Sequence, residues 1–291
     1  MWQIELAKGL AKAAMPFPGT VRRLKRTLRP YRADPANSHL ACRQGLEQIR
    51  LLREAGADLG GVVMELGTGW LPTVPLLFHL AGARRLILTD VQRLMDATTL
   101  AEAKRVVLAN EDLVRGPLGL SPAAFRERLE RLPACDYLVP WDPAALPEGS
   151  VDVLISRTVL EHIPAPVLED YAGAFRRILR PGGVMCHLID NSDHWQHHDR
   201  RLGRLHFLRY DDDWRWRLLC LRRYQNRLRH SDYLALFARH GWQAAAALGE
   251  PDPASLRDLA TLPLAPRFRF YAPEDLAILT SLLVLRRPAD A

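Results

Sequence analysis

The segment Glu65-Leu66-Gly67-Thr68-Gly69 follows a short apolar run and has the composition of a turn that binds a nucleotide-like ligand. Glycines there let the backbone bend sharply and approach a ligand closely. Asp90 ends the next apolar run, about 20 residues further on, where a carboxylate can accept hydrogen bonds from ribose hydroxyls. The same pattern would arise if the glycines only formed a turn and Asp90 only capped a helix. A purely structural role for the turn and Asp90 therefore stays open.

A second polar group, Asp190-Asn191-Ser192-Asp193-His194, follows a later apolar run, and His197 and His198 come directly after it. His194 is a candidate general base, oriented by Asp190 or Asp193, because imidazole is the commonest proton acceptor in catalysis. Two other readings remain: a polar anchor for the chain that follows, or a divalent metal bound by His194, His198 and one Asp. We expect no bound metal.

Short, nearly continuous apolar runs alternate with helical periodicity after about residue 38, which predicts an α/β sheet buried on both faces and mostly parallel. The expected strands are 62–66, 86–90, 137–139, 151–156, 184–189, a short one after Trp242, and 277–285. Helices are expected after Ser38, a potential N-cap, and from Ser231 to His240. Residues 191–230 interrupt the alternation, and residues 251–275 are expected to be irregular.

Five segments in this order resemble the class I S-adenosylmethionine-dependent methyltransferases, particularly their small-molecule branch. They are Glu65 to Gly69, Asp90, Trp141-Asp142-Pro143, the run Ser156-Arg157-Thr158-Val159-Leu160-Glu161-His162-Ile163, and Leu179-Arg180-Pro181-Gly182-Gly183. The resemblance covers residues 60–190 and extends over 230–287. It implies a Rossmann-like sheet of seven mostly parallel strands, the last one antiparallel, with helices on both faces and a helical or irregular cap over the acceptor, about 191–230.

The resemblance also implies S-adenosylmethionine as cofactor and assigns residues to it. The glycine turn would line the amino-acid part of the cofactor, and Asp90 would hold the ribose beside Val91. Asp142 would meet the adenine amine beside Pro143. The loop that begins with Ser156 and Arg157 would lie below the sulfonium. The expected cofactor-binding residues are Glu65, Gly67, Thr68, Gly69, Asp90, Val91, Asp142, Pro143, Ser156 and Arg157. One departure is Leu71, which stands where the family often has a third glycine.

We therefore expect methyl transfer to a small-molecule acceptor, most simply an oxygen of a sugar-like or secondary-metabolite compound, with N-methylation of a small amine as an alternative. A nucleic-acid substrate is disfavoured, because Ser156-Arg157-Thr158-Val159 replaces the Asn/Asp-Pro-Pro-aromatic motif of enzymes that methylate nucleic-acid amines. A nicotinamide-dependent oxidoreductase would need a full GxGxxG turn and a Tyr-xxx-Lys pair, which are not visible. A non-catalytic relative that only binds the cofactor also remains.

The formal charge of +7 is concentrated at the amino terminus. Residues 1–35 hold eight basic and two acidic side chains, which leaves 32 basic and 31 acidic among the other 256 of the 291 residues. We expect residues 1–37 to form a basic amphipathic segment that covers the acceptor pocket or rests on an anionic membrane. Residues 38–287 would form the catalytic domain. Four scattered cysteines and the charged amino terminus predict a cytoplasmic protein of undetermined oligomeric state.

Overall fold

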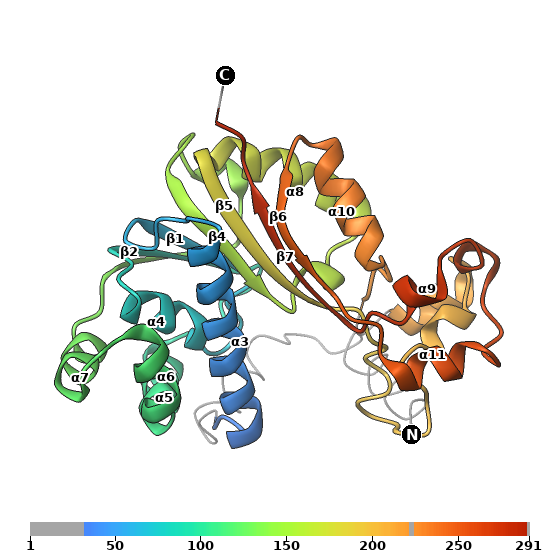
Figure 1. Ribbon diagram of the computed structural model, residues 1–291, viewed down its shortest axis with the longest axis horizontal. Coiled ribbons are helices and arrows are strands. Elements are labelled where there is room, and N and C mark those ends of the chain that lie inside the picture. The colour runs from blue at the N-terminus through green and yellow to red at the C-terminus, as the bar shows by residue number, and fades with distance from the viewer. Residues whose placement is uncertain (1–31, 221–223, 290–291) are drawn as a thin grey trace, which may run out of the picture.

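A computed structural model describes residues 32–220 and 224–289. Its sheet has seven strands in the order β3-β2-β1-β4-β5-β7-β6 (Figure 1). β1 to β5 are parallel, and β7 runs antiparallel to both β5 and β6, which confirms the expected sheet. The strands are β1 Val62–Leu66, β2 Arg85–Thr89, β3 Ala134–Leu138, β4 Val151–Arg157, β5 Leu179–Asp190, β6 Gln243–Leu248 and β7 Thr280–Arg286.

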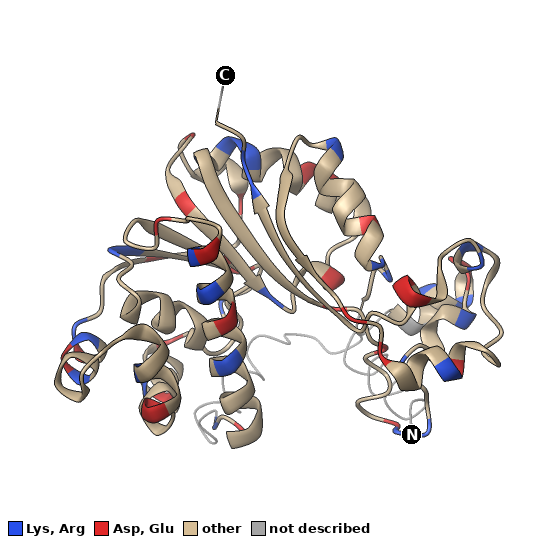
Figure 2. Cartoon of the chain, in the orientation of Figure 1, with Lys and Arg blue, Asp and Glu red and all other residues tan. Residues whose placement is uncertain are grey.

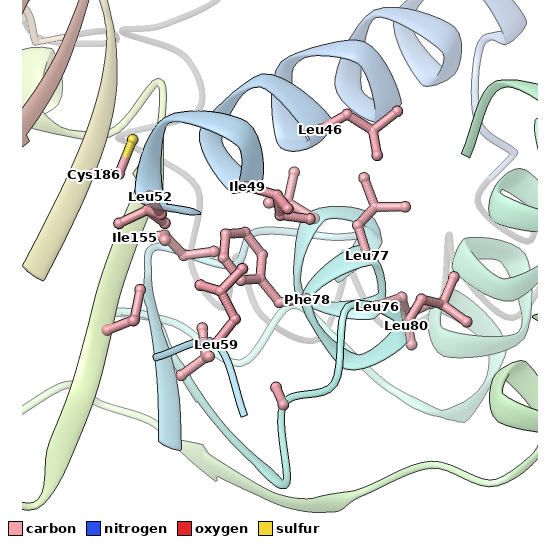
Figure 3. Packing of buried hydrophobic residues seen from close by; sticks show 14 of the residues in the cluster. Leu46, Ile49, Leu52, Leu59, Leu76, Leu77, Phe78, Leu80, Ile155 and Cys186 are labelled. Atoms are coloured by element: carbon pink, nitrogen blue, oxygen red, sulfur yellow. The ribbon is translucent and has the colours of Figure 1, made fainter. Parts of the chain in front are cut away.

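Helices cover both faces of this sheet because neighbouring strand residues point to opposite sides. Val63 and Ile155 belong to one buried cluster, whereas Met64 and Leu154 belong to the other. The first face carries α3 Pro35–Glu54, α4 Thr73–Leu80, α5 Ala97–Ala109, α6 Glu111–Leu118 and α7 Pro122–Glu130. The second carries α8 Ala165–Ile178 and α10 His230–Arg239. Figure 3 shows side chains of α3 and α4 packed against each other and against Ile155 of β4.

The first described helix begins earlier than Ser38, the expected cap. Asp34 is the N-cap of α3, and its Oδ1 accepts the N–H of Asn37 at 3.0 Å. Pro35 suits the first helical position because its fixed φ matches the helix and its missing N–H would have no partner there. The Ser38 hydroxyl instead donates to the Asp34 carbonyl at 2.7 Å. Residues 1–31 of the expected basic segment lie outside the described residues.

The cap contains a second segment that the sequence did not predict. Its core joins Trp195, Phe207 and Trp216 from the expected insertion to Phe268 and Leu276 from the chain between β6 and β7. Figure 1 shows α9 and α11 together at one end of the molecule, apart from α3 to α7. The short helices of the cap are η3 His206–Arg209, α9 Trp214–Cys220, α11 Pro253–Leu259, η4 Pro266–Phe268 and α12 Pro273–Leu276.

The helix expected to start with a Ser231 cap begins instead at His230, with Arg229 as N-cap. The N–H of Arg229 donates to Asp232 Oδ2 at 2.8 Å, while the Ser231 hydroxyl contacts Asp275 of the cap at 2.5 Å. Figure 2 shows positive and negative residues interspersed over the described helices, as the near-neutral count for residues 36–291 leads one to expect. None of the described helices has the length and apolarity needed to cross a membrane.

Candidate active site

The glycine turn after β1 closes onto the end of β2. Gly67 and Gly69 have φ values of 73° and 68°, and a Cβ on Gly67 would lie 2.6 Å from Val159 Cγ2. The N–H of Gly69 donates to Asp90 Oδ2 at 2.9 Å, and the N–H of Thr68 donates to the Thr89 carbonyl at 2.9 Å. The structure thus brings the predicted turn and the predicted acid together, and the carboxylate helps to hold the turn.

A cavity of about 500 Å³ opens beside this turn. Five of the predicted cofactor residues line it: Glu65, Gly67, Thr68, Gly69 and Arg157. Further lining comes from the start of α3, through Asp34, Asn37 and Ser38, which sequence reasoning did not include. The only sequence signal for these residues is that the first turn of α3 is polar, whereas the rest of the helix is amphipathic. The sequence does not show that this turn lies next to β1, because that position depends on tertiary packing.

The cavity lining combines a buried carboxyl with a half-buried guanidinium. Glu65 is 6% exposed, and its Oε2 and the Thr68 hydroxyl have no hydrogen-bond partner among the described residues. Burial raises the pKa of Glu65 to about 8. Burial also lowers the pKa of Arg157, whose Nε donates to Gln44 Oε1 at 2.7 Å. Unsatisfied polar atoms beside a cation suit a ligand that carries both an ammonium and a carboxylate.

The remaining predicted cofactor residues lie outside the lining of this cavity. Val91 is 69% exposed next to Asp90, and Asp142 caps η1 Pro143–Ala145 through the Ala144 N–H at 2.9 Å. The N–H of Trp141 donates to the Asp90 carbonyl at 2.9 Å, so the ends of β2 and β3 are adjacent. The binding roles of Asp90, Val91, Asp142 and Pro143 stay predictions.

Ser156 does not face the cavity. It is 1% exposed, and its hydroxyl is 2.8 Å from His187 Nδ1 on the neighbouring strand β5. Burial lowers the pKa of His187 to about 3, which leaves the imidazole neutral within the core. The pair is a buried hydrogen bond inside the sheet, and it is Arg157, one residue later, that lines the cavity.

The predicted catalytic residues lie at the carboxyl end of β5. His194 Nε2 is 3.3 Å from Asp190 Oδ2, whereas Asp193 Oδ1 accepts the Trp195 N–H and its Oδ2 lies 3.6 Å from His206 Nδ1. Asp190 is therefore the carboxylate beside the His194 imidazole, and Asp193 faces the cap. Burial favours a higher pKa for Asp190, but the contacts with His194 and Ser192 outweigh it and lower that pKa.

Two residues of the irregular segment before α10, residues 224–229, bond to this part of the molecule. The N–H of His194 donates to Gln225 Oε1 at 3.0 Å, and Gln225 Nε2 donates to the Ser192 carbonyl at 2.9 Å. Asn226 Nδ2 donates to the Leu160 and Ile163 carbonyls at 2.8 and 2.9 Å. These two bonds tie η2, Leu160–His162, to Asn226, next to the Gln225 that holds the chain after β5. Amide side chains with this function carry no sequence signal beyond their polarity.

Buried Glu161 lies between the residues around His194 and those that line the cofactor cavity. Glu161 is 2% exposed, and burial raises its pKa to about 8. The Arg157 guanidinium interacts electrostatically with both Glu65 and Glu161. The N–H of Thr158, which lines the cavity, donates to the Leu188 carbonyl at 2.7 Å, two residues before Asp190. The cofactor cavity and the predicted catalytic residues thus lie next to each other at the carboxyl ends of the central strands, which form one edge of the sheet.

Comparison with known proteins found one matching family model and several similar solved structures. Residues 122–187 match a family model described as a methyltransferase domain. Among solved structures, an S-adenosylmethionine-dependent methyltransferase from Mesorhizobium loti is similar at 16% identity and a TM-score of 0.44, over 81% of this chain and 95% of that one. The 1,6-didemethyltoxoflavin-N1-methyltransferase of Burkholderia thailandensis is similar at 14% identity and a TM-score of 0.47, over 85% and 78%. A search of curated protein sequences found no match.

The sheet order, the antiparallel β7 and the matched methyltransferase domain define a class I methyltransferase fold. The match to the methyltransferase-domain model runs from α7 into β5, residues 122–187.

Proposed function

We propose that this protein is an S-adenosylmethionine-dependent methyltransferase that methylates an oxygen of a small-molecule acceptor, of a sugar-like or secondary-metabolite type. The observation that carries the proposal is the Asp190–His194 contact of 3.3 Å at the sheet edge that also holds the cofactor cavity. A hydroxyl acceptor must lose a proton, and an imidazole beside a carboxylate is suited to receive it. An amine acceptor can react after positioning alone, so this pair favours oxygen over the alternative of N-methylation.

The cofactor residues act by binding and orientation. Arg157 is placed to pair with the carboxylate of the methionyl group, and Glu65 with its ammonium. The glycine turn lets the backbone approach the ligand, while Asp90, Val91, Asp142 and Pro143 at the ends of β2 and β3 would receive the ribose and adenine. When bound, S-adenosylmethionine supplies an activated methyl group on a sulfonium.

His194 then handles the proton of the acceptor. The bound cofactor would supply the methyl group to the acceptor oxygen, and the His194 imidazole would accept the proton that this oxygen loses. The Asp190 carboxylate, 3.3 Å from Nε2, would stabilise the positive charge of the imidazolium that forms. Asp193 acts indirectly, because its contacts with Trp195 and His206 fix the chain after β5.

The acceptor would lie between this edge and the cap. Nothing in the described residues points to a nucleic-acid partner, and positive and negative charges are interspersed over the described helices (Figure 2). Contact with a membrane through the amino-terminal segment remains a prediction, because residues 1–31 lie outside the described part of the chain.

Calorimetry with S-adenosylhomocysteine tests the cofactor half of the proposal. We expect saturable binding by the wild type and a loss of about tenfold or more in Asp90→Asn, because a carboxylate bonded to ligand hydroxyls contributes about 1.5–3 kcal/mol. Asp136→Asn, on the exposed edge strand β3, is the matched control and should bind normally. Absence of binding by the wild type would refute the cofactor assignment.

A screen for S-adenosylhomocysteine release with hydroxylated and amine acceptors tests the other half. For a hydroxyl acceptor, His194→Asn should lower turnover about 100-fold or more while cofactor affinity stays unchanged. His39→Asn, whose exposed imidazole contacts Asn110 at the end of α5, is the control. Unchanged turnover in His194→Asn would remove the base role, and turnover confined to amines would favour N-methylation.

A further inference from the structure

We propose that Glu161, His162 and His194 form a binding site for a divalent cation of the zinc type. One potential ligand atom from each side chain lies within 4.8 Å of those of the other two. The rings of His162 and His194 face each other obliquely, with centroids 4.9 Å apart and planes at 54°. This trio differs from the set that the sequence suggested, because Glu161 and His162 take the places of His198 and an Asp.

Two of the three donors are buried atoms in need of a partner. Glu161 Oε2 and His194 Nε2 have no hydrogen-bond partner among the described residues. Asp190 Oδ2 lies 3.3 Å from His194 Nε2 but is not aligned for a hydrogen bond. Leaving a buried polar atom unsatisfied costs free energy. A cation between these atoms would remove that cost.

His162 has the orientation that metal-binding histidines commonly show. Its Nδ1 is 2.8 Å from the Tyr224 carbonyl, which only accepts, so Nδ1 carries the proton and Nε2 carries the lone pair. A backbone carbonyl behind the ring is a frequent outer partner of a metal-bound imidazole, because it fixes both the tautomer and the ring orientation. His162 is also exposed, so an ion from solvent can reach the site.

The segment 224–226 holds the donors together without any metal. Tyr224 fixes the His162 ring, Gln225 holds the His194 backbone, and Asn226 holds η2, which carries Glu161 and His162. Metal bonds of about 2.0–2.1 Å would bring the donor atoms to about 3.3 Å from one another. The donor atoms, which lie within 4.8 Å of one another, would therefore have to approach by at most about 1.5 Å.

The donor set indicates which ions would bind. Two imidazoles and one carboxylate form the three-ligand set of many catalytic zinc sites, which leave a further position for water or substrate. Magnesium and calcium prefer sites made entirely of oxygen ligands, so they should bind this trio weakly.

A cation here would compete with the base. The proposed function requires the lone pair of His194 for a proton, and a neutral imidazole has one lone pair to give. A bound Zn²⁺ would therefore inhibit methylation of a hydroxyl acceptor, so the site would be inhibitory.

Metal binding can be measured directly on the full-length protein without an affinity tag, after treatment with a chelator and dialysis. Titration with ZnCl₂ in a calorimeter should show one equivalent bound. Glu161→Gln and His162→Asn should each weaken Zn²⁺ binding by about 100-fold. His162 is exposed, so its replacement should not disturb folding. His39→Asn should leave Zn²⁺ binding unchanged. Co²⁺ in place of Zn²⁺ should give visible absorption that the same two variants abolish. S-adenosylhomocysteine binding by each variant shows that it is folded.

No Zn²⁺ binding by the wild type would overturn the proposal. Binding that survives in Glu161→Gln and His162→Asn but is lost in His198→Asn would overturn it as well. The acceptor screen, run with metal-free and Zn²⁺-loaded protein, separates the site from the proposed function. A lower rate with Zn²⁺ agrees with both proposals, whereas a higher rate would keep the metal site and remove His194 as the base.

Discussion

The cofactor cavity and the acceptor edge lie on the same edge of the sheet but are assembled differently. The turn that lines the cavity is a short local element, with glycines in left-handed conformations and one carboxylate, Asp90, bonded to it 21 residues away. The acceptor edge brings together residues 160–162, 190–194 and 224–226, which meet only when the whole chain has folded. The first is fixed by backbone conformation and the second by long-range side-chain bonds.

This difference determines where each region is vulnerable. At the cofactor cavity, one methyl group added to a glycine of the turn should distort the backbone that lines the cavity. In the acceptor half, loss of one long side chain leaves buried carbonyls without donors. The following variants test that contrast, beginning with the largest expected effect.

Arg229→Met should cost about 3–5 kcal/mol of unfolding free energy. Arg229 is fully buried, and its guanidinium donates to the carbonyls of Asn191, Leu276 and Ile278, each at 3.0 Å. These bonds tie the chain after β5 to the second segment of the cap. Without them the Asn191 and Leu276 carbonyls lose their donor, and the Ile278 carbonyl keeps only Asn191 Nδ2, at 3.2 Å. Urea denaturation measures the loss, and limited proteolysis should show earlier cleavage within the cap.

The control for Arg229→Met is Arg239→Met, which removes an exposed arginine that pairs with Glu169 on α8. It should cost well under 1 kcal/mol, as surface ion pairs generally do. Equal effects of the two variants would mean that Arg229 does not fasten the cap.

Gly67→Ala should cost about 2–4 kcal/mol and weaken S-adenosylhomocysteine binding. The new Cβ would meet Val159 Cγ2 at 2.6 Å, and a φ of 73° is itself unfavourable for alanine. Gly69→Ala measures the cost of the left-handed backbone conformation alone, because the φ of Gly69 is 68° but no atom lies within 4 Å of the new Cβ. We expect about 1–2 kcal/mol for Gly69→Ala by denaturation. If Gly69→Ala were the more damaging of the two, contact with Val159 would not constrain the turn.

The same contrast explains what could be predicted from the sequence. Strand β1 has the expected limits, Val62 and Leu66, because a buried parallel strand and its glycine turn are both visible as local patterns. The seven-strand topology followed from the ordered motifs. Ser156 was expected near the sulfonium, but the alternation of side chains along β4 directs it into the core toward His187.

What the sequence did not predict depends on distant contacts. Ser231 has the type of an N-cap, yet tertiary structure uses its hydroxyl to contact Asp275 in the second cap segment. That segment was expected to be irregular, because its short helices alternate with prolines and show no period. The pairing of Glu161 with His194 crosses from η2 to the chain after β5, and no spacing rule connects two such positions.

The pH dependence of stability should differ between the wild type and Glu65→Gln. Burial raises the pKa of Glu65 from 4.5 to about 8, so folded protein keeps a proton that the unfolded chain loses. Stability due to this group is therefore fully present below the unfolded pKa and falls as the pH rises toward 8, by about 1.4 kcal/mol per pH unit. Between pH 6 and 7 the Tm of the wild type should fall by roughly 3–5 °C more than that of Glu65→Gln.

Glu148→Gln, which removes an exposed carboxylate from the loop before β4, is the control and should follow the wild type. Calorimetric scans without cofactor at both pH values measure the difference. If the wild type and Glu65→Gln lost the same Tm, Glu65 would already be ionised in the folded protein. Arg157 would then hold it as an ion pair, and the cofactor would have to separate two paired charges. A clear difference would instead mean that the cavity presents a neutral carboxyl beside a cation, so that binding of the methionyl ammonium would be coupled to loss of the Glu65 proton.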